Sequence, residues 1–134
     1  MKMFLLMILG HFIADFTLQG WFANGKQEMW WREQCADEDN MEFERRWKKY
    51  GNDYKCAMFE HGLYWSLITF SPLFFFTQIS EIALLIIVVA NAVFHAWIDD
   101  LKANQFKINL IQDQFWHFIQ IAITASVSWF LIFK

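Results

Sequence analysis

Hydrophobic and polar residues alternate in long blocks along this chain. Apolar residues dominate four stretches, at about 3–23, 57–77, 81–98 and 110–133, each close to the ~20 residues that cross a bilayer core. The third and fourth are convincing on composition alone, whereas His11 and Asp15 interrupt the first. The pattern predicts an all-α fold, a four-transmembrane-helix bundle that makes one integral membrane domain of residues 1–134.

The segment between the first two stretches, residues 24–56, holds most of the charged residues of the chain. It also carries an aromatic stripe at helical spacing: Phe43, Trp47, Tyr50 and Tyr54. We therefore expect a charged amphipathic helix in this loop, ending at Gly51–Asn52. Two interpretations remain open: the helix lies on the membrane or caps the bundle, or it is solvated with only its aromatic face on the bundle.

The distribution of Lys and Arg predicts how the bundle is oriented. The 24–56 and 99–109 loops carry nearly all of them, and the opposite side carries only Lys2 and Lys134. The positive-inside rule therefore places the 24–56 loop in the cytoplasm and both termini outside. The first stretch follows Lys2 as a signal peptide would, but no small-residue cleavage site follows, so we expect it to be retained. The two cysteines, Cys35 and Cys56, then lie on the reducing side and form no disulfide.

Composition narrows the class of protein. The chain has 134 residues, of which 57% are apolar and 20% aromatic, and its formal net charge is −3. Soluble domains are about 45–50% apolar, so an ordinary soluble enzyme is not favoured. An acidic chain without a basic patch also argues against nucleic-acid binding, and so much apolar sequence excludes a disordered protein. The partners that we expect are membrane lipids.

Each predicted span contains one histidine, and three of these histidines have an aspartate four residues away. Residues at i and i+4 share one face of a helix. Because successive spans run in opposite directions, all of these groups fall toward the cytoplasmic side, where they can converge. The candidate metal ligands are His11, Asp15, His61, His95, Asp99, Asp113 and His117.

Ionisable groups inside a bilayer need partners, because each costs about 2.5–3.5 kcal/mol to insert. A divalent cation shared between helices would satisfy several at once. The absence of cysteine among the candidates favours Zn²⁺, Mn²⁺ or Fe²⁺, as one or two ions. Two alternatives stay open: a purely structural set of interhelical hydrogen bonds, and a proton or ion path. We expect further polar residues to orient the ligands or contact substrate: Gln19, Asn91, Lys102, Gln114 and Gln120. Lys102 is also suited to hold an anion such as phosphate.

Four motifs occur in order along the chain: HFIADFTLQGWFANGK (residues 11–26), HGLYW (61–65), HAWIDDLK (95–102) and DQFWH (113–117). Together they resemble small polytopic membrane proteins of bacteria and phages, catalogued as domain of unknown function 3307. The resemblance covers most of the chain, and residues 27–56 depart from it most. It implies a bacterial inner-membrane protein, often phage-encoded, whose motifs are similar to those of predicted membrane-bound metal-dependent hydrolases.

Two functions from different classes follow as expectations. The first is a metal-dependent hydrolase acting on a lipid or phosphodiester-type substrate at the cytoplasmic leaflet, with Asp15 or Asp113 as general base. The second is a non-enzymatic phage protein that excludes superinfecting phage or binds a host membrane protein through the 27–56 loop. In that case the polar core, with or without a metal, only holds the bundle together.

Overall fold

The computed structural model describes residues 2–132, and over these residues the chain is helical with no strand. This confirms the all-α prediction. The elements are α1 (Lys2–Phe12), the π-helical turn η1 (Ile13–Thr17), α2 (Phe22–Gly25), α3 (Glu28–Cys35), α4 (Asn40–Tyr50), α5 (Asp53–Phe76), α6 (Glu81–Ala103) and α7 (Leu110–Ile132).

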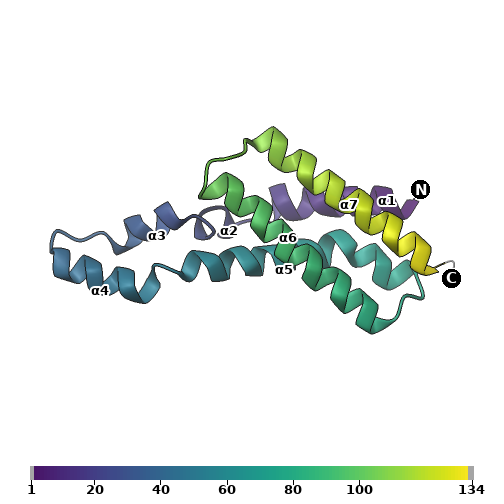
Figure 1. The fold of residues 1–134 in the computed structure, drawn as a ribbon, viewed down its shortest axis with the longest axis horizontal. Coiled ribbons are helices and arrows are strands. Elements are labelled where there is room, and N and C mark those ends of the chain that lie inside the picture. The colour runs from purple at the N-terminus through teal and green to yellow at the C-terminus, as the bar shows by residue number, and fades with distance from the viewer. Residues whose placement is uncertain (1, 133–134) are drawn as a thin grey trace.

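The long helices α1, α5, α6 and α7 gather into a bundle, and the ends of α1 and α7 lie together at one end of it (Figure 1). Helix α5 is central, since both α1 and α6 pack mainly against it. Helices α3 and α4 run out from the other end of the bundle and back, as an arm. Trp65, Phe70 and Leu73 of α5, together with Met7 and Ile121, form the buried apolar core.

Local polar contacts set where the helices begin. The side chain of Ser80 accepts a hydrogen bond from the backbone N–H of Ala83 and caps α6, and Asp39 caps α4 in the same way. Before α7, Asn109 and Gln112 each accept the other's backbone N–H at 3.0 Å, a reciprocal cap. These caps explain why α6 and α7 begin at the residues where the apolar stretches begin.

The first predicted span, 3–23, differs from the structure. Continuous helix ends at Thr17. The backbone N–H of Leu18 bonds to the carbonyl of Ile13 five residues back, which is π-helical pairing, and Gly20 then adopts a left-handed conformation with φ of +50°. The chain turns at this point, so Lys26 returns to the bundle.

By length and composition, α6 and α7 are apolar enough to cross a membrane, whereas the other described helices do not meet that measure. The four-span prediction is therefore not confirmed. The surface nevertheless reverses the pattern of a soluble protein. Phe75, Ile82 and Ile111 are 79%, 74% and 80% exposed, while His95 and Asp99 are fully buried. This reversal is what a lipid environment favours, because polar side chains avoid hydrocarbon by facing the bundle interior.

Candidate metal centre

Six of the seven candidate ligands meet in the bundle interior, where none is more than 6% exposed. Four separate elements supply them. Asp15 comes from η1 and His61 from α5; His95 and Asp99 come from α6; Asp113 and His117 come from α7. Residues more than a hundred positions apart are thereby brought to one place, as the alternation of helix direction predicts.

The distances between imidazole nitrogens and carboxylate oxygens are longer than hydrogen bonds. His61 Nε2 lies 3.6 Å from Asp15 Oδ1 and 3.6 Å from Asp99 Oδ2. His117 Nε2 lies 3.4 Å from Asp113 Oδ1 and 3.5 Å from Asp99 Oδ1. These separations exceed the usual N–H···O range of about 2.7–3.2 Å. They suit two ligands of one ion, because ligand atoms ~2.0–2.2 Å from a metal lie somewhat over 3 Å apart.

The ring nitrogens of three buried histidines have no hydrogen-bond partner among the described residues. Both nitrogens of His61, His95 and His117 are unpaired, as are Asp99 Oδ1 and Asp113 Oδ1. Buried polar atoms are almost always satisfied, so a concentration of unsatisfied ones indicates a missing water or ion. Every one of these atoms can act as a metal ligand. The residues present therefore fit a divalent cation.

Three overlapping groups of residues could each hold an ion, with ligand atoms within 4.8 Å of one another: Asp15–His61–His95, His95–Asp99–His117 and Asp15–Asp113–His117. Each pair of groups shares one residue, and of these shared residues Asp15 is the carboxylate that could bridge two ions about 3.5–4 Å apart. All donors are nitrogen or oxygen, which fits Zn²⁺, Mn²⁺ or Fe²⁺.

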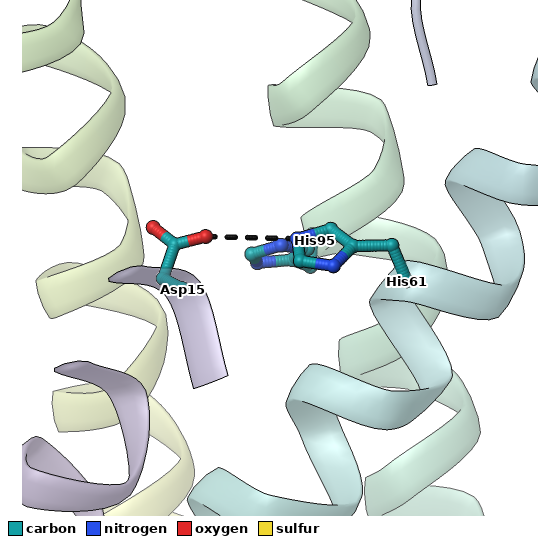
Figure 2. Close-up of side chains that lie close together, drawn as sticks. All are labelled: Asp15, His61 and His95. Atoms are coloured by element: carbon teal, nitrogen blue, oxygen red, sulfur yellow. Dashed lines mark ion pairs between the residues drawn. The ribbon is translucent and has the colours of Figure 1, made fainter. Parts of the chain in front are cut away.

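Neighbouring aromatic rings hold the histidines in place. The ring of His95 stacks on Trp65 and on His117, each with ring centroids 4.2 Å apart. Figure 2 shows Asp15 facing His61 and His95 from the opposite side of the cluster, with the ion pair between Asp15 and His61 dashed. The imidazoles therefore have defined orientations.

His11 stands apart from the other six candidates. The indole N–H of Trp65 donates to His11 Nδ1 at 2.9 Å, so that nitrogen must be unprotonated. His11 Nε2 then carries the proton and donates to Gln114 Oε1 at 2.9 Å. Both ring nitrogens are thus engaged, and His11 belongs to none of the three groups. In place of the predicted ligand role, its contacts make it a support for Gln114.

Gln114 in turn contacts two of the carboxylates. Its amide donates to Asp15 Oδ2 at 2.8 Å and to Asp113 Oδ2 at 3.2 Å. Trp65, His11 and Gln114 therefore form a hydrogen-bonded chain that ends on two of the candidate ligands. Such outer contacts fix the orientation of metal ligands, which is the role that the sequence predicts for Gln114.

Of the remaining polar candidates, Gln19 and Lys102 contact the cluster, whereas Asn91 and Gln120 contact each other. With the amide of Gln19 oriented to satisfy its neighbours, it donates to the Asp15 carbonyl and accepts from Lys26 Nζ. Asn91 and Gln120 instead bond to each other at 2.9 Å, joining α6 to α7 as a structural contact. Lys102 Nζ lies 2.5 Å from Asp113 Oδ2.

Sequence reasoning missed two residues of the site. Lys26 is 4% exposed, and its ammonium lies 2.5 Å from Asp99 Oδ2. Trp65 is fully buried and supports His11. The four-residue spacing from His61 to Trp65 places both on one face of α5, a signal that could have identified Trp65. Lys26 is the last residue of the first motif, but its spacing along the chain gives no reason to place it in the site.

Comparisons with models of protein families, with curated proteins and with solved structures found no match. The resemblance to domain of unknown function 3307 therefore stays a prediction that rests on the four motifs.

Proposed function

We propose that this protein is a metal-dependent hydrolase of the bacterial inner membrane, acting at the cytoplasmic leaflet. The observation that supports this most is the set of buried imidazoles of His61, His95 and His117, whose ring nitrogens lack partners among the described residues and face three aspartates. A purely structural polar core would join these groups by hydrogen bonds, as the side-chain N–H of Gln120 donates to Asn91 Oδ1.

The proposal includes a four-span topology. Helix α5 falls below the hydropathy that α6 and α7 reach, yet its polar residues His61, Ser66 and Thr69 are fully buried inside the bundle. Its outer face is apolar, with Leu67 and Phe75 exposed. At 1.5 Å per residue, its 24 residues span ~36 Å, enough for a hydrocarbon core of ~30 Å. Helix α1 continues through η1 with the same apolar exterior.

The metal ligands and the aspartates would have different roles in hydrolysis. A bound divalent cation lowers the pKa of a coordinated water toward ~7, so that the nucleophile is available at neutral pH. Among the described residues Asp113 Oδ1 has no hydrogen-bond partner and lies 3.4 Å from His117 Nε2, while Gln114 and Lys102 donate to its other oxygen. Asp113 is thereby oriented to take a proton from the attacking water, and Asp15, held by the same Gln114, is the other candidate base.

Metal content tests the first part of the proposal. Protein purified in mild detergent and dialysed without chelator should hold at least one equivalent of metal by elemental analysis. The double variant His95→Ala, His117→Ala should lose it. Asp99→Asn should also lower it, while the neighbouring Asp100→Asn, outside the three groups, should not. Wild-type protein with clearly sub-stoichiometric metal would contradict the proposal.

Hydrolysis tests the second part. Metal-loaded protein should cleave a lipid ester or phosphodiester in mixed micelles. Asp113→Asn or Asp15→Asn should slow the reaction by about 10²–10⁴-fold, the usual contribution of general acid–base catalysis. Asp100→Asn again serves as the matched control. If neither aspartate variant changes the rate, the measured hydrolysis does not come from this site.

A binding protein is the second candidate function, favoured by the arm of α3 and α4. Helix α4 has no buried residue, and the arm projects away from the bundle (Figure 1). At its base the arm is held to the end of α6, where the backbone N–H of Glu28 donates to Asn104 Oδ1 at 2.8 Å. Replacing residues 30–50 with a short Gly/Ser linker separates the candidates: a hydrolase keeps its metal and its activity, whereas a binding protein loses its cellular effect.

A further inference from the structure

We propose that the substrate is a lipid bearing a phosphate ester, which enters between η1 and α7 and reaches the metal centre past Gln114. This inference rests on the proposed function, because it names the substrate class of the same site. Three features of the structure carry it: the charge of the site, the position of two lysines, and an apolar groove that ends at Gln114.

The first feature is the charge of the buried site. The site holds three carboxylates, of Asp15, Asp99 and Asp113, and the two ammonium groups of Lys26 and Lys102. Its net charge is therefore −1 when the imidazoles are neutral. One divalent cation would change this charge to +1, and two would change it to +3. Excess charge in a low-dielectric interior is costly unless an opposite charge balances it. A phosphate ester supplies one or two negative charges, whereas a neutral carboxylic ester supplies none.

The second feature is the position of the lysines. Lys26 Nζ contacts Asp99 Oδ2 and Lys102 Nζ contacts Asp113 Oδ2, each at 2.5 Å. They therefore approach the cluster at two different carboxylates, contributed by α6 and α7. Once cations share those carboxylates, the compact ammonium groups remain next to the centre as phosphate donors. Two cations beside the candidate ligands therefore suit an anionic substrate, with Lys26 buried and the side chain of Lys102 25% exposed.

The third feature is a groove of about 400 Å³ on the outer face of the bundle. It is lined by Phe16 of η1 and by the first turns of α7: Leu110, Ile111, Gln114, Phe115 and Phe118. Gln114 is its one polar side chain, and the amide of Gln114 bonds to Asp15 and to Asp113. Lys102 contacts the same Asp113 Oδ2, so hydrogen bonds link Gln114 in the groove lining to Asp113, and Asp113 to Lys102.

The apolar lining of the groove and the nearby Lys102 together indicate its occupant. An acyl chain fits its apolar walls, which are part of the exposed apolar surface, since Ile111 is 80% exposed. The phosphate at the head of that chain then lies at the Gln114 end, beside Lys102. In the reaction, a water oxygen bonds to phosphorus while the bond from phosphorus to the lipid alcohol oxygen breaks. The water proton goes to Asp113 or Asp15, and the leaving alkoxide takes that proton from the aspartic acid to give the free lipid alcohol, which restores the carboxylate.

Binding to metal-loaded protein tests the proposal without relying on turnover. The probes are phosphatidic acid in mixed detergent micelles and inorganic phosphate, with diacylglycerol micelles as the neutral control, all measured by isothermal titration calorimetry. We expect phosphatidic acid to bind and diacylglycerol not to. Lys102→Met should weaken both phosphate probes about tenfold or more, a typical loss for one charged hydrogen bond, whereas the exposed Lys107→Met should not. Lys102→Arg, which keeps the charge, should restore much of the affinity and shows that loss of folding is not the cause.

A groove variant distinguishes a lipid from a soluble phosphate ester. Ile111→Trp fills the groove, so it should weaken phosphatidic acid binding about tenfold while inorganic phosphate binds as before. Ile123→Trp, an equally large change at an exposed position of α7 outside the groove, should alter neither probe. If Ile111→Trp leaves phosphatidic acid binding unchanged, the lipid entry route is wrong.

Metal content measured on the same samples separates the two proposals. Metal present with no phosphate binding, or with binding that ignores Lys102 and the groove, overturns this inference and leaves the metal-dependent hydrolase intact. Metal absent from wild-type protein overturns both. Equal affinity for diacylglycerol and phosphatidic acid overturns the phosphate assignment, because the charge of the site then plays no part in recognition.

Discussion

At the scale of single residues, the hydrogen-bonded chain from Trp65 through His11 to Gln114 predicts a long-range effect on metal binding. Trp65→Phe keeps an aromatic side chain but removes the indole N–H that donates to His11 Nδ1. Gln114 then loses its defined partner, and Asp15 and Asp113 lose their fixed orientation. We expect metal affinity to fall by about tenfold or more, as for other outer contacts of metal ligands.

Competition with a chromogenic chelator measures this affinity. The matched control is Trp97→Phe, because Trp97 is 54% exposed on α6 and lies outside the cluster. Unchanged affinity in Trp65→Phe would show that His11 and Gln114 play no part in arranging the ligands. A complete loss of metal would instead indicate that His11 coordinates the ion directly in the loaded protein.

The residue scale also shows what could be predicted from sequence. A histidine and an aspartate four residues apart in an apolar helix form a pattern that sequence alone can show. This pattern identifies His95, Asp99, Asp113 and His117, because both the helical spacing and the cost of burying charge can be read within one segment. The role of His11 could not be read in this way. It depends on a tryptophan 54 residues away, and hydrogen-bond partners across helices leave no periodic signal.

At the scale of elements, the π-helical turn η1 decides what Asp15 does. In a regular helix, His11 and Asp15 would present one stripe, as the sequence analysis expects. The wider turn from Ile13 to Thr17 changes their relative direction, so His11 bonds to Gln114 while Asp15 approaches His61 at 3.6 Å. The left-handed Gly20 then turns the chain so that Lys26 enters the site. Both features are local departures from helical periodicity, and therefore analysis by period misses them.

Contact between α5 and α6 gives a prediction at the same scale. Gly62 allows the helices to approach closely, because a Cβ at this position would lie 2.5 Å from the carbonyl oxygen of Ala92. Gly62→Leu must push the helices apart, and His61 then moves away from His95, with which it shares a predicted ligand group. We expect a loss of about 1–3 kcal/mol or more in stability, as for overpacked cores, together with reduced metal content.

Thermal unfolding in detergent and elemental analysis check this result. Ala90→Leu adds the same side chain at an exposed position of α6, and it should leave both the melting temperature and the metal content unchanged. A Gly62→Leu protein as stable as wild type would mean that α5 and α6 are not packed as closely as the structure shows.

At the scale of the whole molecule, polar residues inside and apolar residues outside make the bundle suited to lipid. Hydropathy alone recognises α6 and α7 and not α5, and part of that difference comes from residues such as His61, which counts as polar in the sequence but is buried in the bundle. A helix that contributes a ligand to a buried centre must carry such residues. The polar residues that the proposed site requires in α5 therefore lower the hydropathy of this helix without facing the outside of the bundle.

The topology that follows can be tested by labelling cysteines at the two ends of α5. Cys56 is exposed near the start of α5, and Gln78 is exposed just after its end. A helix of 24 residues that crosses the bilayer puts these positions on opposite sides. In a Cys35→Ala background, a membrane-impermeant maleimide should label Cys56 only after spheroplasts are lysed, in agreement with the positive-inside rule. In a background that also carries Cys56→Ala, Gln78→Cys should react in intact spheroplasts.

Val88→Cys, buried in the middle of α6, is the control that should react only after denaturation. Labelling of both ends from the same side would mean that α5 does not cross. The candidate ligands of α6, His95 and Asp99, lie at the end of that helix near Lys102. If α5 does not cross, His61 cannot meet them beneath the cytoplasmic headgroups. Reversed labelling would keep the bundle and its cluster but place the metal centre at the outer leaflet, where the substrate would have to come from the periplasmic side. The two ends of α5 therefore decide both whether the site forms within a membrane and which leaflet supplies its lipid.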